Sequence, residues 1–157
     1  MANERRGNRL KTPKKKPKVI KPRKILGIDG TKFGIDRPGW ATLIIVIDWY
    51  TKEILGYEIS LRNKSSQWIT ALQEALFNGY PEGAMGKGIK LVSDYGSQPT
   101  SKSFMKFCSE LGIKQIFASY NNLKGNAETE WKKKEMKKLH RELNKFSEFL
   151  VLIFRGV

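Results

Sequence analysis

The chain has 157 residues, of which 39% are hydrophobic and 11% aromatic, and this is enough to bury the core of one domain. The composition excludes a disordered protein. A formal net charge of +15 predicts a polyanionic partner, with nucleic acid as the first candidate. An anionic membrane surface fits less well, because the basic N-terminal segment has no apolar face to insert.

Residues 1–23 are predicted to form a basic, flexible arm. Residues 1–24 hold eleven Lys or Arg residues, Lys24 included, and one acid, so they carry +10 of the net charge. Prolines at positions 13, 17 and 22 block helix and sheet pairing, and like charges repel. Two interpretations stay open: Lys14, Lys15 and Lys16 bind DNA phosphates, or the arm is the solvated remainder of a missing upstream domain.

Cysteine usage and apolar runs bear on the compartment. Cys108 is the single cysteine, so no disulfide framework exists and a reducing compartment is expected. It falls within an apolar helical pattern, which favours a buried structural thiol over a nucleophile. No apolar segment follows the basic start, so no signal peptide is expected. The apolar run at 149–154 is too short to span a bilayer.

Three strand patterns precede the first helix. Residues 24–33 predict a strand with Ile25 and Ile28 in the core. Residues 40–48 contain a continuous, mostly β-branched run that predicts a central strand buried on both faces. Residues 53–61 alternate in polarity and predict a strand antiparallel to the second.

Helices and strands alternate in the rest of the chain. Ser65 or Ser66 is expected to cap a helix that ends at Gly79. The further elements are a loop at 81–88, a strand ending at Asp94, a helix at about 101–111, a strand at 113–118, a polar loop at 119–125, and a helix from Asn126 to near Asn144 or Phe146. This order predicts an α/β fold with a mixed five-stranded sheet flanked by helices.

Three carboxylates are candidates for one site. Asp29 interrupts the first strand, and Asp94 lies at the carboxyl end of another, where α/β sheets place their working groups. Glu130 lies in the first turn of the last helix, with 35 residues between it and Asp94. Hard divalent cations prefer carboxylate oxygens, and two such ions roughly 3.5–4 Å apart can catalyse phosphoryl transfer on DNA.

Bringing these acids together has a predicted consequence. Three carboxylates at close range repel one another and raise one another's pKa values without metal. We therefore expect metal binding to release protons and to order the Glu130 helix. Spacing alone leaves open that the acids are ordinary strand-end residues, because a chain with 15 acids offers many such triplets.

Basic residues accompany Glu130. Lys137 lies seven residues later, two helical turns on, so it shares a face with Glu130, and Lys133 and Lys134 flank that line. The arrangement predicts a surface for a phosphate backbone. The alternative is an ordinary solvated basic helix.

The motifs together resemble those of a known family, the integrase catalytic core of bacterial insertion-sequence transposases, which is related to retroviral integrases. The matching stretches are IDGTKF at 28–33, VIDWYTK at 46–52, KLVSDYGSQPT at 90–100 and SYNNLKGNAETE at 119–130. The resemblance implies a ribonuclease H-like fold, with Asp29, Asp94 and Glu130 as catalytic ligands of Mg²⁺ or Mn²⁺, two ions in all. The implied chemistry is nicking at transposon ends followed by attack of the freed 3′-OH on target DNA.

Partners follow from the same resemblance. Asn121, Asn122 and Lys124 are expected to approach DNA beside the site. Chemistry at two transposon ends implies a homo-oligomer acting on both transposon ends and target DNA, without a membrane partner. A cytoplasmic, nucleoid-associated protein of a bacterium is expected.

Several positions depart from the family's pattern. Tyr95 stands where Asn or Arg is usual, Gly30 where a β-branched residue is usual, and Trp131 where Arg or Ser is usual. Asp48 recurs in the family after the second strand, and we interpret it as structural. Glu128 faces elsewhere on its helix than Glu130 and favours the helix N-terminus electrostatically.

Both ends of the chain also depart from the family's pattern, so it stays open whether the chain is active. The resemblance covers about residues 24–138; we expect a core at 24–146, a divergent tail at 147–157, and a chain truncated at both ends. One alternative is therefore a catalytically silent transposase remnant that only binds DNA. Another is a structure-specific nuclease on the same fold, against which the Gly-Ser-Gln after Asp94 argues.

Overall fold

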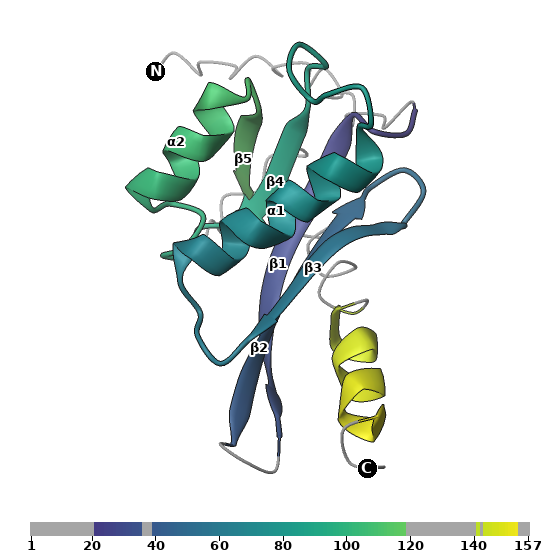
Figure 1. Ribbon diagram of the computed structural model, residues 1–157, viewed down its shortest axis with the longest axis vertical. Helices are drawn as coiled ribbons and strands as arrows, with labels where there is room; N and C mark the ends of the chain where they lie inside the picture. Colours follow the sequence, from purple (N-terminus) through teal and green to yellow (C-terminus); the bar gives the residue numbers. More distant parts are fainter. Residues whose placement is uncertain (1–20, 36–38, 119–140, 142, 154–157) are drawn as a thin grey trace, which may run out of the picture.

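The computed structural model describes residues 21–35, 39–118, 141 and 143–153. In these residues five strands form one mixed sheet in the order β3-β2-β1-β4-β5. The strands are β1 (Ile25–Gly34), β2 (Trp40–Asp48), β3 (Ile54–Ser60), β4 (Lys90–Asp94) and β5 (Lys114–Ala118), and the labelled helices are α1 (Ser65–Gly79) and α2 (Lys102–Glu110). Residues 143–153 are also helical. Figure 1 shows α1 and α2 beside the sheet and the C-terminal helix below them.

The sheet confirms the predicted mixed five-stranded sheet and the antiparallel pairing of its second and third strands. β1 pairs with β2, and β2 with β3, in antiparallel ladders. β1 also pairs with β4, and β4 with β5, in parallel ladders. Each predicted strand lies within a residue or two of the observed one. β2 is buried along its length except for Trp40, as the continuous apolar run predicts for a central strand.

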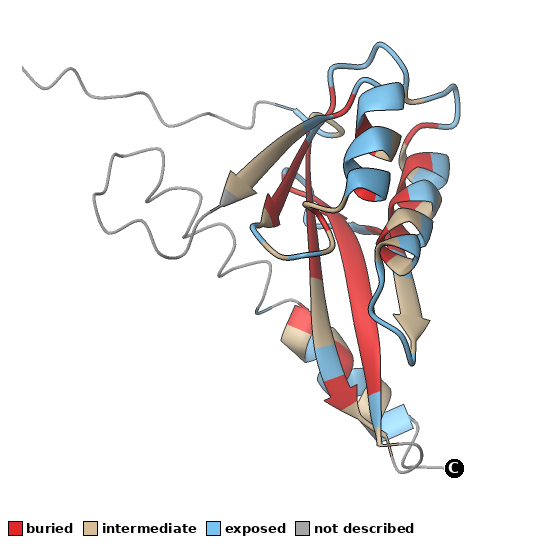
Figure 2. Ribbon diagram, turned by 90° about the vertical axis from the view of Figure 1, so that its left-hand side faces the viewer, coloured by how far each residue is buried: buried red, intermediate tan, exposed pale blue. Residues whose placement is uncertain are grey.

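Two hydrophobic clusters cover opposite faces of the sheet. Leu26 and Ile28 of β1 pack with α1 and α2 in one cluster. Ile25 and Phe33 of β1 belong to the second cluster, which also contains Leu143 of the C-terminal helix. The division follows from the pleat, because successive side chains of a strand point to opposite faces. Figure 2 shows the buried residues concentrated along the strands and on the inner sides of the helices.

The N-terminus of α1 differs from the prediction. Its N-cap is Lys64, not Ser65 or Ser66. The side-chain oxygen of Gln67 accepts a hydrogen bond of 2.9 Å from the Lys64 backbone N–H, half of a capping box, and this starts the helix earlier. The Ser65 hydroxyl instead accepts a 2.9 Å hydrogen bond from Ser103, next to the first residue of α2. The N-cap of α2 is Ser101, whose hydroxyl accepts a hydrogen bond from Phe104 N–H.

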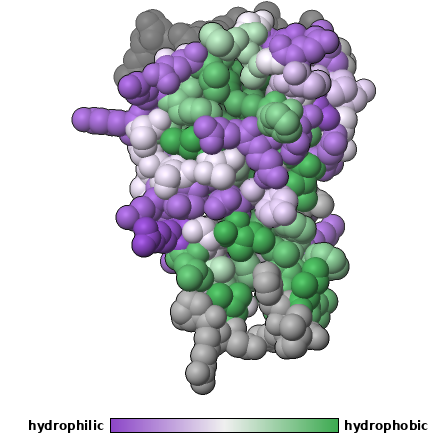
Figure 3. Space-filling model, in the orientation of Figure 1, coloured by the Kyte–Doolittle hydropathy of each residue, from purple (hydrophilic) through white to green (hydrophobic). Residues whose placement is uncertain are grey.

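The end predicted for the last helix is wrong. The sequence predicts an end near Asn144 or Phe146, yet residues 143–153 are helical. Leu143 is fully buried, and Phe146 and Leu150 pack against the same cluster, so apolar spacing carries the helix past the predicted end. Its predicted start at Asn126 lies outside the described residues. Figure 3 shows hydrophobic surface around this helix, where Phe149 and Leu152 are exposed.

None of the helices in the described part of the chain is long and apolar enough to cross a membrane.

Candidate active site

Two of the three predicted carboxylates occupy equivalent positions on neighbouring parallel strands. The ladder between β1 and β4 ends at the pair Gly27 and Val92. Asp29 lies two residues beyond Gly27, and Asp94 two residues beyond Val92. Because the side-chain period of a strand is two, both carboxylates lie on the same face as Val92. Asp29 and Asp94 therefore lie on adjacent strands, as a shared site requires.

The ladders diverge at this point. β1 continues to pair with β2 as far as Gly34, while β4 pairs with β5 through Asp94 and Ala118. Beyond Val92 the pairing between β1 and β4 stops, so the two acids flank the place where the sheet divides. This is the carboxyl end of β4, a position where open α/β sheets bind ligands.

The acids share their face with the C-terminal helix. Val92 and Leu143 belong to one hydrophobic cluster, whereas α1 and α2 pack on the other face. Glu130 precedes Leu143 by 13 residues and lies outside the described residues, as do Lys133 and Lys137. Leu143, 13 residues after Glu130, thus lies on the face of the sheet that carries Asp29 and Asp94.

A short turn holds Asp94. Its Oδ1 accepts a 3.0 Å hydrogen bond from Gly96 N–H, and Thr100 Oγ1 donates to the Gly96 carbonyl at 2.7 Å. A Cβ at Gly96 would lie 2.9 Å from Asp94 Oδ1, so only glycine permits this close approach. The Ser101 hydroxyl then donates to the Gln98 carbonyl at 2.7 Å and joins the turn to α2. The turn leaves Asp94 half-buried.

Asp29 is more enclosed. It is 7% exposed, and its Oδ1 accepts a 2.9 Å hydrogen bond from Gly30 N–H. The Trp68 indole packs on the other side of the strand, and a Cβ at Gly30 would lie 3.0 Å from it. Trp68 thus fills the space that a larger side chain at position 30 would occupy, which explains the glycine that departs from the family's pattern.

Trp68 also connects Asp29's strand to the Asp94 turn. Its ring N–H donates to Asn63 Oδ1 at 2.9 Å, and Gln98 Nε2 donates to the Asn63 carbonyl at 2.7 Å. Phe104 of α2 meets the indole edge to face, with ring centroids 6.3 Å apart. We call Trp68, Asn63 and Gln98 the bracing network. The sequence does not reveal it, because Gln98 lies 35 residues from Asn63, and only the Gly30 departure hinted at a large neighbour.

Asp48 behaves as the structural residue predicted. It is fully buried and accepts two hydrogen bonds from Arg23, at 2.6 Å from the backbone and 2.9 Å from the guanidinium. Tyr50 and Thr51 N–H groups donate to its other oxygen. Burial raises the pKa of Asp48, but these hydrogen bonds outweigh burial and hold that pKa below its ordinary value. Arg23, assigned to the arm by sequence, is joined to the core.

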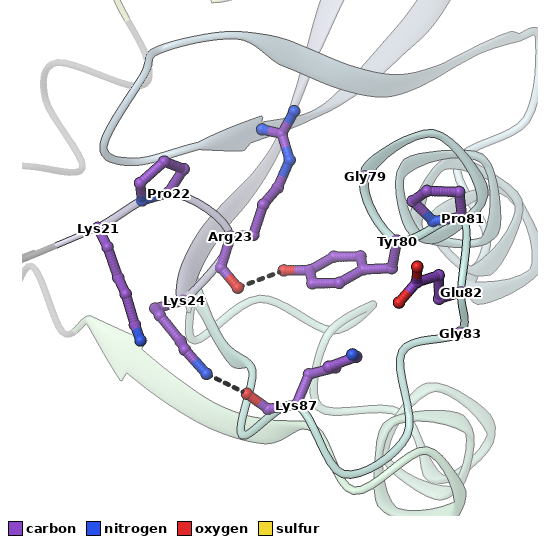
Figure 4. A pocket seen from close by; sticks show the side chains of 10 residues that line it. All are labelled: Lys21, Pro22, Arg23, Lys24, Gly79, Tyr80, Pro81, Glu82, Gly83 and Lys87. Atoms are coloured by element: carbon purple, nitrogen blue, oxygen red, sulfur yellow. Dashed lines mark hydrogen bonds between the residues drawn. The ribbon is translucent and has the colours of Figure 1, made fainter.

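A pocket of about 380 Å³ lies at this end of β1, opposite to the carboxyl end of β4. Figure 4 shows Tyr80 donating to the Arg23 carbonyl at 2.8 Å and Lys24 Nζ donating to the Lys87 carbonyl at 2.6 Å. Burial and the neighbouring Asp48 raise the pKa of Tyr80 to about 12, so its hydroxyl stays a donor. These bonds fasten the point where the basic arm enters the domain.

The donor set suits a hard divalent cation but is incomplete in the described residues. Asp29 and Asp94 supply oxygens on one face, as Mg²⁺ or Mn²⁺ prefers. No group of three His, Cys, Asp or Glu residues comes together within the described ranges, and Glu130 lies outside them. Also outside are the other predicted DNA contacts, Lys14, Lys15, Lys16, Asn121, Asn122 and Lys124. Cys108 is buried, as predicted, and burial raises its pKa to about 12.

Solved structures share this architecture. The catalytic core domain of HTLV-2 integrase, a structure in complex with magnesium, matches with a TM-score of 0.53 at 20% identity over 64% of each chain. A chain of a simian T-cell lymphotropic virus intasome matches with a TM-score of 0.55 at 19% identity, over 80% of this chain and 41% of that one. These likenesses confirm the ribonuclease H-like fold expected from the sequence.

Sequence comparisons lead to the same family. The transposase described for insertion sequence element IS986/IS6110 of Mycobacterium tuberculosis is 30% identical over 89 residues, and a Mycobacterium bovis counterpart matches equally. The match covers 54% of this chain and 32% of the relative, so the chain spans about a third of it. The family described as Integrase core domain matches residues 20–122, which is more than half of the chain. The chain therefore belongs to the integrase core domain family, whose members act in DNA integration and transposition.

Proposed function

We propose that the chain is the catalytic core of a DDE transposase or integrase that nicks DNA and transfers the freed strand. Asp29, Asp94 and Glu130 hold two divalent ions, Mg²⁺ or Mn²⁺, in this proposal. The observation that carries it is the equivalent placement of Asp29 and Asp94 on one face of two parallel strands, where the sheet divides. Membership of the integrase core domain family supports the reaction class.

The chain's own residues have separate parts in this chemistry. When bound, the divalent ions activate the attacking oxygen and neutralise charge on the phosphate. Gly96 N–H fixes the rotamer of Asp94, and Gly30 N–H does the same for Asp29. The bracing network joins the turn after Asp94 to the Trp68 indole, which packs against Gly30 beside Asp29. Such positioning matters because loss of a supporting contact typically costs 10- to 100-fold in metal affinity or activity.

The proposed substrate is DNA. The net charge of +15 supports a polyanionic partner. The proposed phosphate and base contacts are Lys14, Lys15, Lys16, Asn121, Asn122, Lys124, Lys133 and Lys137. The active assembly contains at least two copies, one for each transposon end, and acts on bacterial DNA in the nucleoid. Dimeric and trimeric forms of the HTLV-2 integrase core support self-association.

A plasmid assay tests the proposal. The chain is incubated with supercoiled DNA and Mn²⁺ beside Asp29→Asn, Asp94→Asn and the control Glu110→Gln, which alters an exposed acid on α2. We expect nicking by the parent and the control, and at least roughly 100-fold less by the two Asn variants. Equal nicking by Asp94→Asn would overturn the assignment.

The same samples test the alternative functions. A folded parent that shifts DNA in gels with steep salt dependence, yet does not nick it, is a silent remnant that only binds DNA. Degradation of an RNA–DNA hybrid in place of plasmid nicking would instead support a structure-specific nuclease.

A further inference from the structure

Tyr95 is an exposed aromatic residue directly after Asp94. Its side chain is 71% exposed. Its ring lies 4.9 Å from that of half-buried Phe117, centroid to centroid, with a tilt of 56°. We call Tyr95 and Phe117 the aromatic pair. An exposed tyrosine that is held by a second ring presents a large, pre-positioned apolar surface to solvent.

The sheet register explains why the two rings meet. Ser93 of β4 is opposite Phe117 of β5. Tyr95 lies two residues beyond Ser93 on the same side of the pleat, so it is a diagonal neighbour of Phe117, within reach of an aromatic side chain. The edge position of β5 leaves this corner of the sheet at the surface.

The position of Tyr95 is also tied to Asp94. The hydrogen bond from Gly96 N–H to Asp94 Oδ1 closes a small ring of atoms that contains the Tyr95 backbone. Thr100 fixes the Gly96 carbonyl in turn. Tyr95 thus belongs to the same hydrogen-bonded turn as Asp94, and by the pleat its side chain points to the opposite face of the sheet.

We propose that the aromatic pair is a stacking platform for an unpaired base of the DNA strand next to the cleaved phosphate. This inference rests on the proposed function, because it places a phosphate at Asp94. Tyr95 and Asp94 share the carboxyl end of β4, with consecutive Cα atoms about 3.8 Å apart, so a DNA strand that crosses this end from the Asp94 face brings a flanking base within reach of Tyr95. Every base has a π-face, so the platform takes a frayed base of any sequence.

The test combines substitutions in the protein with removal of bases from the DNA and compares their effects on binding. Binding is measured by fluorescence anisotropy at fixed salt, with Ca²⁺ in place of Mn²⁺, on a forked duplex with an unpaired tail. A second fork carries abasic sites in that tail and so keeps the phosphates but not the bases. We expect the parent to prefer the fork with bases by roughly 5- to 100-fold, the range for stacking one base.

Variants at Tyr95 distinguish the contribution of its aromatic ring from those of side-chain bulk and of stability. Tyr95→Ala and Tyr95→Leu should lose the preference for bases, whereas Tyr95→Phe should keep it. Tyr50→Ala is the matched control, because Tyr50 is 52% exposed at the other end of the sheet, after β2. Since the Tyr95 side chain is exposed, its variants should melt as the parent does, and Tyr95→Leu keeps apolar bulk if the alanine variant does not fold.

Three results would overturn the platform. They are an unchanged preference in folded Tyr95→Ala or Tyr95→Leu, a loss in Tyr95→Phe as large as in Tyr95→Ala, and a parent that does not distinguish bases from abasic sites. A Tyr95→Ala variant that changes only self-association would assign this corner to a second copy instead. Failure of the proposed catalysis is separate, since it appears as absent Mn²⁺-dependent nicking while the preference for bases persists.

Discussion

Two aspartates at opposite ends of the sheet differ in burial and in hydrogen bonding. Asp48, at the end where the arm enters, is fully buried and accepts hydrogen bonds on both oxygens, from Arg23, Tyr50 and Thr51. Asp94, at the other end, is half-buried and within the described residues accepts one bond, from Gly96. A carboxylate satisfied by its own fold stabilises the domain, while one left open to solvent keeps lone pairs for an incoming ligand.

The same substitution at both ends should separate these roles most strongly. Asp48→Asn places an amide among the donors of Arg23 and Tyr50, so we expect a loss of about 2–3 kcal/mol in the free energy of unfolding. Asp94→Asn keeps its acceptor oxygen and should change stability by about 0.5 kcal/mol or less. Urea denaturation of both variants measures the difference. Equal losses would remove the distinction between a structural and a functional acid.

Substitution of Gly30 probes the packing at the functional end of the sheet, the end that carries Asp29 and Asp94. A Cβ there would crowd the Trp68 indole, so Gly30→Ala should destabilise by about 1 kcal/mol. In a Trp68→Leu background the same change should cost almost nothing, because the crowding ring is gone. A double-mutant cycle of unfolding free energies checks this, and additive effects would show that Gly30 and Trp68 do not compensate.

The smallest expected effect is the pH dependence of the Asp48 end. Its pKa is lowered in the folded protein from an ordinary value of 3.8, so its stabilising contribution is complete above that value. The contribution is lost as pH falls from 3.8 through the folded pKa, because the unfolded chain binds the proton first. The difference in unfolding free energy between parent and Asp48→Asn should therefore narrow below pH 3.8. A constant difference would contradict the pKa assignment.

The strands were predictable because their signals are local. The apolar run of β2 and the alternation of β3 determine burial without reference to distant residues, and the position of Asp94 follows from the strand that it ends. The bracing network was not predictable, since Gln98 meets Asn63 only through tertiary packing, 35 residues away in the sequence. The predicted end of the C-terminal helix was wrong for a similar reason, because Leu150 and Val151 continue the helix by packing on the sheet.

Direct measurement of Mn²⁺ binding tests the central claim, that the functional end of the sheet is a metal site. Mn²⁺ is titrated into the full chain and into Asp94→Asn, with free ion followed by electron paramagnetic resonance and Glu110→Gln as control. We predict saturable binding by the parent and the control, and at least roughly tenfold weaker binding by Asp94→Asn. Equal binding by Asp94→Asn and the parent would contradict the assignment of Asp94 as a metal ligand.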